Sequence, residues 1–250
     1  MYDTTLVMTV NQQAGRPTQA SRPTQASRRA RTRAALLEAA ARGLSRYGYA
    51  NLVLERVAAE AGYTRGALYH LFAGKQELAL AVVAWVDETW QAEVGTPAAD
   101  ASDPVAALIA MARGHAVYCR RDIARVMMTL RVEFSGQDHP VGTAVEDVIR
   151  RLTSGCAALI TAGRASGAIP AGPPPRLLAG AYLSAVEGLV IGVAGHAPFD
   201  VELAERVVRG LLGLPPQPPQ PPQPPQPMTL STNPHVSAVL TCSRIPERAR

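Results

Sequence analysis

Apolar residues through the middle of the chain recur at intervals of three and four, the spacing that places side chains on one face of an α-helix. A first stripe occupies residues 36–44 and stops at Gly48, and a second, shorter one occupies residues 54–61 and stops at Gly62. The segment GTPAADASDP at 95–104 is expected to form a loop. Further helices are predicted at 76–93, 104–121, 123–134, 141–166, 176–196 and 201–214.

Strand signals are missing from the sequence. No segment alternates between polar and apolar residues with a period of two, and no Asn-Gly or Asp-Gly hairpin turn occurs. The pattern therefore predicts an all-α protein of about nine helices.

Both ends of the chain differ in composition from the helical middle. Residues 1–27 are polar and repeat the hexapeptide RPTQAS in tandem, which is typical of a duplication in an unconstrained, disordered tail that can still act as a basic arm. The triplet PPQ occurs four times within 215–227, where proline excludes helix and favours an extended polyproline II segment. We expect the globular fold to end near Leu214 and residues 228–250 to form a second disordered tail.

Positive charge is concentrated in the first part of the chain. Residues 1–75 contain eleven Arg or Lys against four Asp or Glu, whereas residues 76–250 contain fourteen against sixteen. This asymmetry indicates an anionic partner, nucleic acid or a membrane surface, although a solvated basic face has the same composition. Lys75 is the single lysine among 25 basic residues, which fits either a steric demand at a phosphate or chance.

The cysteines and the most apolar segment bear on the cellular compartment. Cys119, Cys156 and Cys242 are odd in number and widely spaced, so neither a disulfide framework nor a zinc site is indicated. The N-terminus lacks the pattern of a secretion signal. Residues 177–194 are apolar but are interrupted by Glu187, which makes them a weak candidate for a membrane span. We therefore expect a cytoplasmic protein with no membrane partner.

The segment AEAGYTRGALYHLFAGK, residues 59–75, has the pattern of two short helices joined by a tight turn. Gly62 can take a positive φ at the end of the first helix. Thr64 can cap the second helix and is included among the candidate DNA contacts. A helix with a packed back and a polar front fits the major groove of DNA. On a helical wheel, the packed back consists of Ala67, Leu68, Leu71 and Phe72.

The polar front of this helix carries side chains suited to DNA. Arg65 can bind guanine or a phosphate, and Gly66 lets the backbone approach closely. Tyr69 and His70 can donate hydrogen bonds to phosphates or base edges. Lys75 begins the next helix, where its ammonium group and the first backbone N–H groups would face one phosphate.

The sequence RVAAEAGYTRGALYHLFAGKQEL resembles the helix-turn-helix of the tetracycline-repressor (TetR) family of bacterial transcription regulators. The resemblance implies a three-helix DNA-binding head at 28–75 and a helical ligand-binding and dimerisation bundle at 76–214. It implies a homodimer on a near-palindromic double-stranded DNA operator, most often a repressor, that is released by a small-molecule effector and needs no metal or other cofactor. The positions in register with the family pattern are Val57, Ala58, Ala61, Gly62, Thr64, Gly66, Leu68, Tyr69, Phe72, Lys75 and Leu78.

Two positions depart from the family pattern. Leu71 stands where the family more often has His or Tyr, so one backbone contact is expected to be missing and His70 to carry more of the binding. Leu52 and Val53 replace a frequent Thr/Ser pair that caps the second helix, and Asn51 is expected to cap instead. In the family a basic arm precedes the first helix, and the residues that match this role are Arg28, Arg29, Arg31 and Arg33.

Small residues on the predicted helix at 176–196 form a candidate dimer interface. Their four-residue spacing permits close approach of another helix. Together with residues 201–214 this helix is expected to form the dimer bundle, although tight packing within one subunit produces the same pattern. The strip consists of Gly180, Ser184, Gly188 and Gly192.

Polar groups set among apolar ones on the middle helices indicate a pocket for a small molecule. Adaptable methionine side chains suit a hydrophobic ligand. Each of these residues also fits an ordinary core or surface position, and His115 fits a core histidine whose nitrogens are already bonded. The candidates are Met111, His115, Tyr118, Met127, Arg131, Phe134, Tyr182 and Glu187.

Catalytic signatures are missing from the sequence. It contains no GxSxG, no HExxH, no phosphate-binding glycine loop and no Cys-His signature, so we do not expect an enzyme. The alternative function is a protein-interaction module in which the PPQ segment docks to a polyproline-binding groove. That alternative leaves the basic N-terminal part and the helix-turn-helix unexplained.

Overall fold

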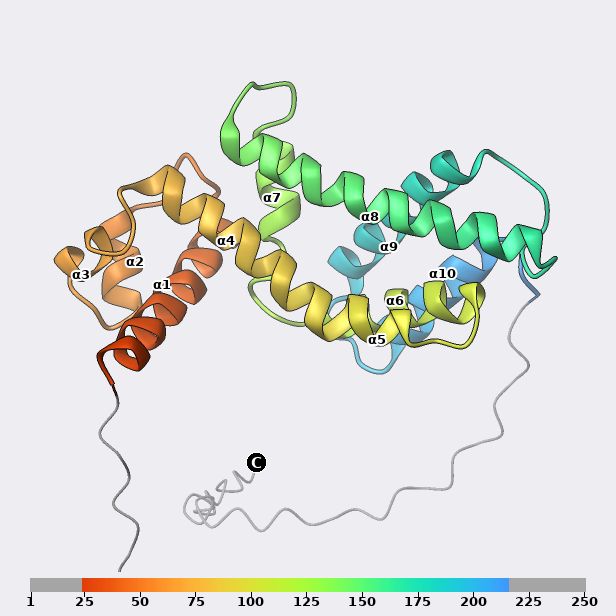
Figure 1. Ribbon diagram of the computed structural model, residues 1–250, viewed down its shortest axis with the longest axis horizontal. Helices are drawn as coiled ribbons and strands as arrows, with labels where there is room; N and C mark the ends of the chain where they lie inside the picture. Colours follow the sequence, from red (N-terminus) through yellow and green to blue (C-terminus); the bar gives the residue numbers. More distant parts are fainter. Residues whose placement is uncertain (1–23, 216–250) are drawn as a thin grey trace, which may run out of the picture. The chain divides into compact units, whose positions relative to one another are not determined.

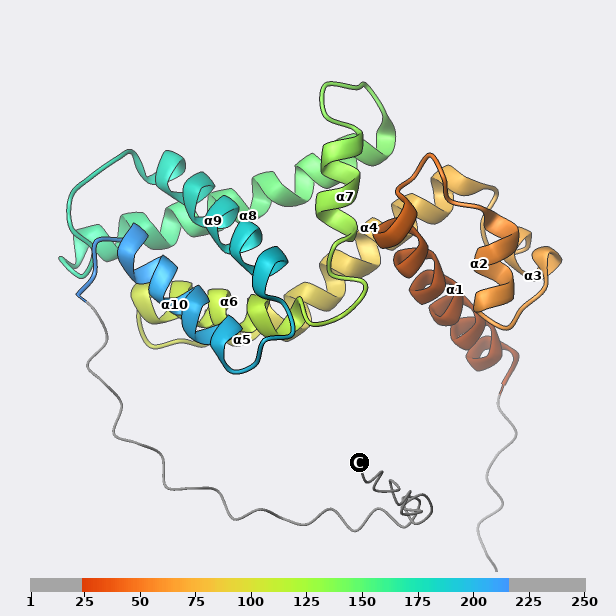
Figure 2. The same cartoon turned by 180° about the vertical axis from the view of Figure 1, so that it is seen from behind.

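The computed structural model describes residues 24–215, and every regular element among them is a helix, as Figures 1 and 2 show from opposite sides. This confirms the expected all-α class. Residues 1–23 with most of the tandem repeat, and the PPQ segment and tail from residue 216 onward, lie outside the described residues. The elements are α1 (Gln25–Tyr47), α2 (Leu54–Glu60), α3 (Arg65–Tyr69), α4 (Lys75–Trp90), a π-helical segment η1 (Gln91–Gly95), α5 (Thr96–Ala99), α6 (Pro104–Tyr118), α7 (Val126–Glu133), α8 (Pro140–Ala165), α9 (Pro175–Val193) and α10 (Phe199–Leu211).

The first helix begins earlier than the sequence pattern suggested. Thr24 caps it, because its side-chain oxygen accepts a hydrogen bond of 3.2 Å from the backbone N–H of Ser27. Helix α1 therefore includes residues 25–27, which the sequence pattern places in the N-terminal tail. It ends at Gly48, whose φ of 73° is a conformation that favours glycine.

The turn between α2 and α3 is built as the sequence predicted. Gly62 has a φ of 76°, and the Thr64 hydroxyl oxygen accepts a hydrogen bond of 3.2 Å from the N–H of Ala67. The expected cap at the start of α2 is wrong. Val53 occupies the capping position without a side-chain bond, and the Asn51 amide instead donates 3.1 Å back to the Tyr47 carbonyl of α1.

The expected loop at 95–104 is also mostly wrong. The chain passes from α4 into the π-helical segment and then directly into α5, so only residues 100–103 are non-helical. Pro97 is compatible with this path because proline is tolerated in the first turn of a helix.

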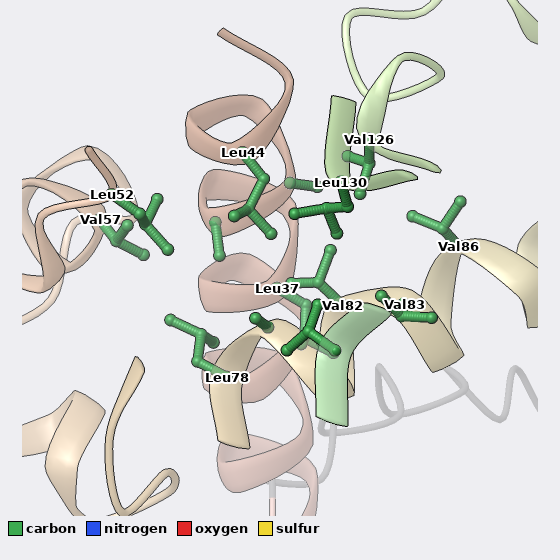
Figure 3. Packing of buried hydrophobic residues seen from close by; sticks show 14 of the residues in the cluster. Leu37, Leu44, Leu52, Val57, Leu78, Val82, Val83, Val86, Val126 and Leu130 are labelled. Carbon is green, nitrogen blue, oxygen red and sulfur yellow. The ribbon is translucent and has the colours of Figure 1, made fainter. Parts of the chain in front are cut away.

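The hydrophobic core continues from the helix-turn-helix part into the rest of the chain. Figure 3 shows side chains of α1, α4 and α7 converging, among them Leu44, Val82 and Leu130, which are fully buried. Helix α7 packs against α1, α4 and α8. The division expected at residues 75 and 76 thus lies at the start of α4 and does not separate two independent cores.

A second hydrophobic core lies between α6, α8, α9 and α10. Two buried carboxylates fix α10 against α6 beside it. Asp200 is fully buried and receives two hydrogen bonds from Arg120, of 2.8 and 2.9 Å. Glu205 is paired with Arg113 at 2.6 Å and with Arg209 at 2.8 Å. The contact between α6 and α10 is therefore held by charge as well as by apolar packing.

Helix α9 is the one described helix whose length and apolar composition would suffice to cross a membrane, with only 28% of its most apolar window buried. Length and composition alone are weak grounds for a membrane span. The low burial reflects an outer face on which Leu177 is 66% exposed and Ile191 is 38% exposed. This face is available for another helix.

Candidate nucleic-acid interface and apolar cavity

Helix α3 has the two faces that its sequence predicted. Leu68 is fully buried and Phe72, just beyond the helix, is 2% exposed, so both anchor this segment to the core. Arg65 and Tyr69 lie on the exposed side, with Tyr69 42% exposed. The Arg65 guanidinium is 5.2 Å from the centroid of the Tyr69 ring and 3.1 Å from the Glu55 carboxylate. These interactions orient Arg65 without burying it.

Three other residues in and just after α3 are Gly66, His70 and Leu71. Gly66 is exposed, and a side chain there would meet nothing closer than the Thr64 hydroxyl at 3.8 Å. His70 is exposed and follows the last residue of α3. Leu71 is half-buried and packs against the core, as the expected apolar face requires. The candidate DNA contacts in and beside α3 are therefore all exposed: Thr64, Arg65, Gly66, Tyr69 and His70.

The four arginines expected to form a basic arm before the first helix lie within α1. Because this helix begins at Gln25, they occupy its first turns, and all four are exposed. Among these four, Arg33 has a contact with the segment after α3, because its guanidinium lies 5.7 Å from the centroid of the Phe72 ring. The expected arm is corrected to a basic helical end formed by Arg28, Arg29, Arg31 and Arg33.

Lys75 has a role that sequence reasoning did not foresee. Its ammonium nitrogen donates a 2.8 Å hydrogen bond to the Ala50 carbonyl and lies 4.7 Å from the centroid of the Tyr49 ring. These contacts tie the start of α4 to the turn between α1 and α2. An ammonium group has three donors, so the bond to Ala50 leaves two for a phosphate.

A cavity of about 110 Å³ opens among α4, α6, α7, α8 and α9. Its size is similar to that of engineered apolar cavities that hold a benzene-sized group. Apolar and aromatic side chains make most of its wall, including Trp90 and Val186. Of the eight residues predicted for a pocket, the seven that line it are Met111, His115, Tyr118, Met127, Arg131, Tyr182 and Glu187.

Phe134 does not line this cavity, so its assignment to the pocket is wrong. Its ring stacks on His139 with centroids 4.3 Å apart and meets Tyr49 edge-on at 5.2 Å. Helix α7 ends at Glu133, and Phe134 follows it with φ −95° and ψ 7°, outside the helical conformation. The helical spacing from Met127 and Arg131 therefore no longer directs its side chain, which packs in the core of the helix-turn-helix part.

Most polar groups of the cavity wall already have partners within the chain. The Tyr182 hydroxyl donates 2.7 Å to the Leu108 carbonyl, and the Tyr118 hydroxyl lies 3.0 Å from that of Thr89. The indole N–H of Trp90 donates 3.0 Å to Nδ1 of His115. These groups therefore offer mainly ring surface to a ligand.

His115 is held as a neutral imidazole. Burial lowers its pKa to about 4. Nδ1 accepts from the indole of Trp90, so the ring proton is on Nε2, which faces the Cys119 sulfur at 3.4 Å. Burial also raises the pKa of Cys119 to about 12, which keeps the thiol uncharged. His115 is thus a histidine with both nitrogens engaged that also forms part of the cavity wall.

Glu187 is different, because it forms no hydrogen bond or ion pair with any residue in the described range 24–215. The other charged side chains of the wall are paired: Asp87 with Arg151 at 2.6 Å, and Arg131 with Glu146 at 3.3 Å. Burial raises the pKa of Glu187, and the positive charge of Arg131 opposes that change. Glu187 is the polar group of the wall left for a ligand to bind.

Glu133 connects the cavity region to the helix-turn-helix part. Its two carboxylate oxygens accept hydrogen bonds of 2.6 Å each from the backbone N–H groups of Tyr49 and Ala50. Met127 and Arg131, on the same helix α7, line the cavity. A displacement of α7 by a ligand would therefore also displace the turn between α1 and α2, through the hydrogen bonds of Glu133.

The small-residue strip of α9 lies at the surface. A side-chain carbon added at Gly180, Gly188 or Gly192 would meet no atom within 4 Å, and Ser184 is exposed. Within one subunit these residues are therefore not in close helix packing. The alternative that the strip serves contacts inside the subunit loses its basis.

Comparison with protein-family models matches residues 36–82 to the bacterial regulatory proteins of the tetR family. The matched stretch contains the helix-turn-helix and the first half of α4. Residues 36–82 therefore form a tetR-family domain. Comparison with curated proteins gives no match by sequence. In the described residues, no group of three His, Cys, Asp or Glu side chains is placed to hold a metal ion.

Several solved structures share the fold of this chain. The structure of AibR with isovaleryl coenzyme A and operator DNA is 20% identical, covers 73% of this chain and 98% of its own, and superposes with a TM-score of 0.60. PfmR from Thermus thermophilus is 21% identical, with coverages of 73% and 99% and a TM-score of 0.60. FadR from Bacillus subtilis with stearoyl-CoA is 15% identical, with coverages of 72% and 97% and a TM-score of 0.61.

Proposed function

We propose that this protein is a homodimeric, cytoplasmic transcriptional regulator that binds a near-palindromic DNA operator through α3 and leaves it when a small hydrophobic molecule fills the cavity. The observation that carries the DNA-binding part is the exposed face of α3, where Arg65 and Tyr69 stand above a buried Leu68. A helix anchored in this way offers rigid side chains to the major groove. We infer repression because release by an effector is the simplest use of such a device.

The effector part of the proposal is supported by the cavity and by its connection to the head. The wall is mostly apolar, and Glu187 is its free polar group. Helix α7 carries both cavity residues and Glu133, whose carboxylate holds the turn after α1. A ligand that shifts α7 would change the position of the head and so favour a dimer unable to bind DNA. Two related structures contain acyl-coenzyme A molecules, which fits a ligand with an apolar group.

The test of this function is selection of bound sequences from a random double-stranded DNA pool by the full chain. We expect enrichment of an inverted repeat whose half-sites are separated by about one helical turn or more, because two recognition helices related by a two-fold axis read two equivalent half-sites. Affinity for the selected site should fall as salt is raised. Recovery of no enriched sequence, or of one without repeated half-sites, would contradict the proposal.

The proposed dimer interface leads to a second prediction. Gly188→Arg should convert the dimer into a monomer, because its long side chain has open space in one subunit but would meet the partner helix in the dimer. Light scattering measures the mass directly. The matched control is Gly155→Arg on α8, where an exposed helical glycine also has no atom within 4 Å. A Gly188→Arg protein that keeps the dimer mass would show that α9 does not form the interface.

A further inference from the structure

A second depression, lined by polar residues, lies near the apolar cavity. It has a volume of about 430 Å³ and lies where the end of α1, the segment from α6 to α7 and the end of α9 meet. Its wall contains four arginines and one acidic residue: Arg46, Arg120, Arg121, Arg125 and Asp122. We name this depression the arginine mouth.

Three of the four arginines are already neutralised by carboxylates. Arg46 pairs with Asp122 at 3.0 Å, Arg120 with Asp200, and Arg121 with Glu93. Arg125 forms no ion pair with any residue between 24 and 215 and is exposed. The mouth therefore keeps one guanidinium without a carboxylate partner among the described residues, and such a group can form a charge-assisted hydrogen bond with an anion.

A second observation at the same place points to an absent partner. Ser45 lines the arginine mouth, and its hydroxyl oxygen is buried without a hydrogen-bond partner among the described residues. Buried hydroxyls in native proteins nearly always have a partner, often a water or a ligand. In a helix such a hydroxyl usually bonds to the carbonyl four residues earlier, and that bond is not made here.

A small third space has wall residues in common with both the arginine mouth and the apolar cavity. This space, of about 20 Å³, shares His115, Ala124 and Glu187 with the cavity wall. At its other end it shares Cys119, Arg125 and Ala194 with the mouth. The three spaces thus follow one another along α6, the start of α7 and the end of α9.

The order of charges along this path selects a kind of ligand. An anion inside the cavity would face the Glu187 carboxyl and an apolar wall, both of which disfavour it. An anion beyond Glu187 would meet Arg125. We propose that the effector is an amphiphile whose compact apolar group fills the cavity and whose carboxylate or phosphate binds in the arginine mouth, with Arg125 as its main partner. This inference rests on the proposed function, because it names the ligand class of the proposed regulator.

The mouth also touches the DNA-binding part directly. Ser45 and Arg46 belong to α1, whereas Arg125 immediately precedes α7 and Ala194 follows α9. The ion pair between Arg46 and Asp122, 3.0 Å long, connects α1 to the segment before α7. An anion bound in the mouth would compete with Asp122 for the Arg46 guanidinium. The charged group of the ligand would thus act on α1 while its apolar group acts on α7.

Titration calorimetry on the full chain without DNA tests this proposal with three probes of equal chain length: octanoate, octyl phosphate and 1-octanol. We expect both anions to bind about tenfold more tightly than the alcohol at low salt, a magnitude typical of a charge-assisted contact. Arg125→Gln should reduce the anions to the affinity of octanol and leave octanol binding unchanged, which also shows that the cavity is intact. The control Arg150→Gln, an exposed arginine of α8 paired with Asp147, should change nothing.

The relative affinities of the two anions identify the source of the charge. Tighter octyl phosphate indicates a phosphate-bearing effector, and tighter octanoate indicates a free acid; both support the arginine mouth. Octanol binding as tightly as the anions would overturn the proposal, as would an Arg125→Gln protein that keeps the preference, or binding of none of the three probes. Because no DNA is present, these outcomes are independent of the operator selection that tests the regulatory function.

Discussion

Replacing Tyr69 with alanine is expected to lower the affinity for the selected operator by about 10- to 100-fold, which corresponds to the 1–3 kcal/mol typical of one specific DNA contact. Tyr69 is 42% exposed and lies at the end of the short helix α3. The Arg65 guanidinium lies over its ring, 5.2 Å from the centroid, in a cation–π contact that orients Arg65. Loss of Tyr69 removes one donor to DNA and releases the orientation of a second. The effect should be seen in a gel shift or by fluorescence anisotropy with the selected site.

Tyr47 provides a closely matched control for this substitution. It is 43% exposed, belongs to the same head, and its ring also lies under an arginine, with Arg56 at 5.4 Å. It is the last residue of α1 and does not lie on the α3 surface. Tyr47→Ala should therefore keep operator affinity within about twofold, since surface substitutions away from a site have small effects. Equal losses in the two variants would show that α3 is not the DNA-reading surface.

The local parts of the site could be predicted from the sequence because they depend on short-range periodicity. The faces of α3 follow from residues within one or two turns, and the Thr64 cap follows from a hydroxyl three residues before an amide. The cavity wall could be predicted for the same reason. Met111, His115 and Tyr118 share one face of α6, so their side chains reach the same space.

The long-range contacts could not be predicted in this way. Glu133 binds backbone N–H groups 83 and 84 residues earlier in the chain, and backbone donors leave no mark in a sequence. Lys75 illustrates the same limit, because its ammonium group binds the Ala50 carbonyl 25 residues away. Phe134 shows that helical spacing predicts a shared face only within the helix, because α7 ends one residue before it and its side chain packs in the other core.

Removing the charge of the buried carboxylate Asp200 on α10 is expected to have the largest effect on the free energy of unfolding. Asp200→Asn should lower the free energy of unfolding by about 2–3 kcal/mol, somewhat less than the usual cost of breaking a fully enclosed ion pair because Arg120 is partly exposed. The Asp200 carboxylate accepts two hydrogen bonds from Arg120 and one of 2.9 Å from the Val201 N–H. An asparagine can accept only at one oxygen and leaves a guanidinium without its counter-charge. The midpoint of urea denaturation, followed by circular dichroism, measures the difference.

The ion pair of Asp200 and Arg120 also determines how the free energy of unfolding changes with pH. Hydrogen bonds from Arg120 hold the pKa of Asp200 below its ordinary value of 3.8. A carboxyl group with a lowered pKa in the folded protein contributes stability above the pKa of the unfolded chain, and that contribution is lost as the pH falls through the folded value. Wild-type stability should therefore decline below about pH 4, and the gap to Asp200→Asn should narrow there. The control Glu202→Gln, two residues along α10 in an exposed pair, should lose about 0.5 kcal/mol or less. A gap between wild type and Asp200→Asn that stays constant from pH 7 to pH 3 would show that the charge of Asp200 does not hold α10 to α6.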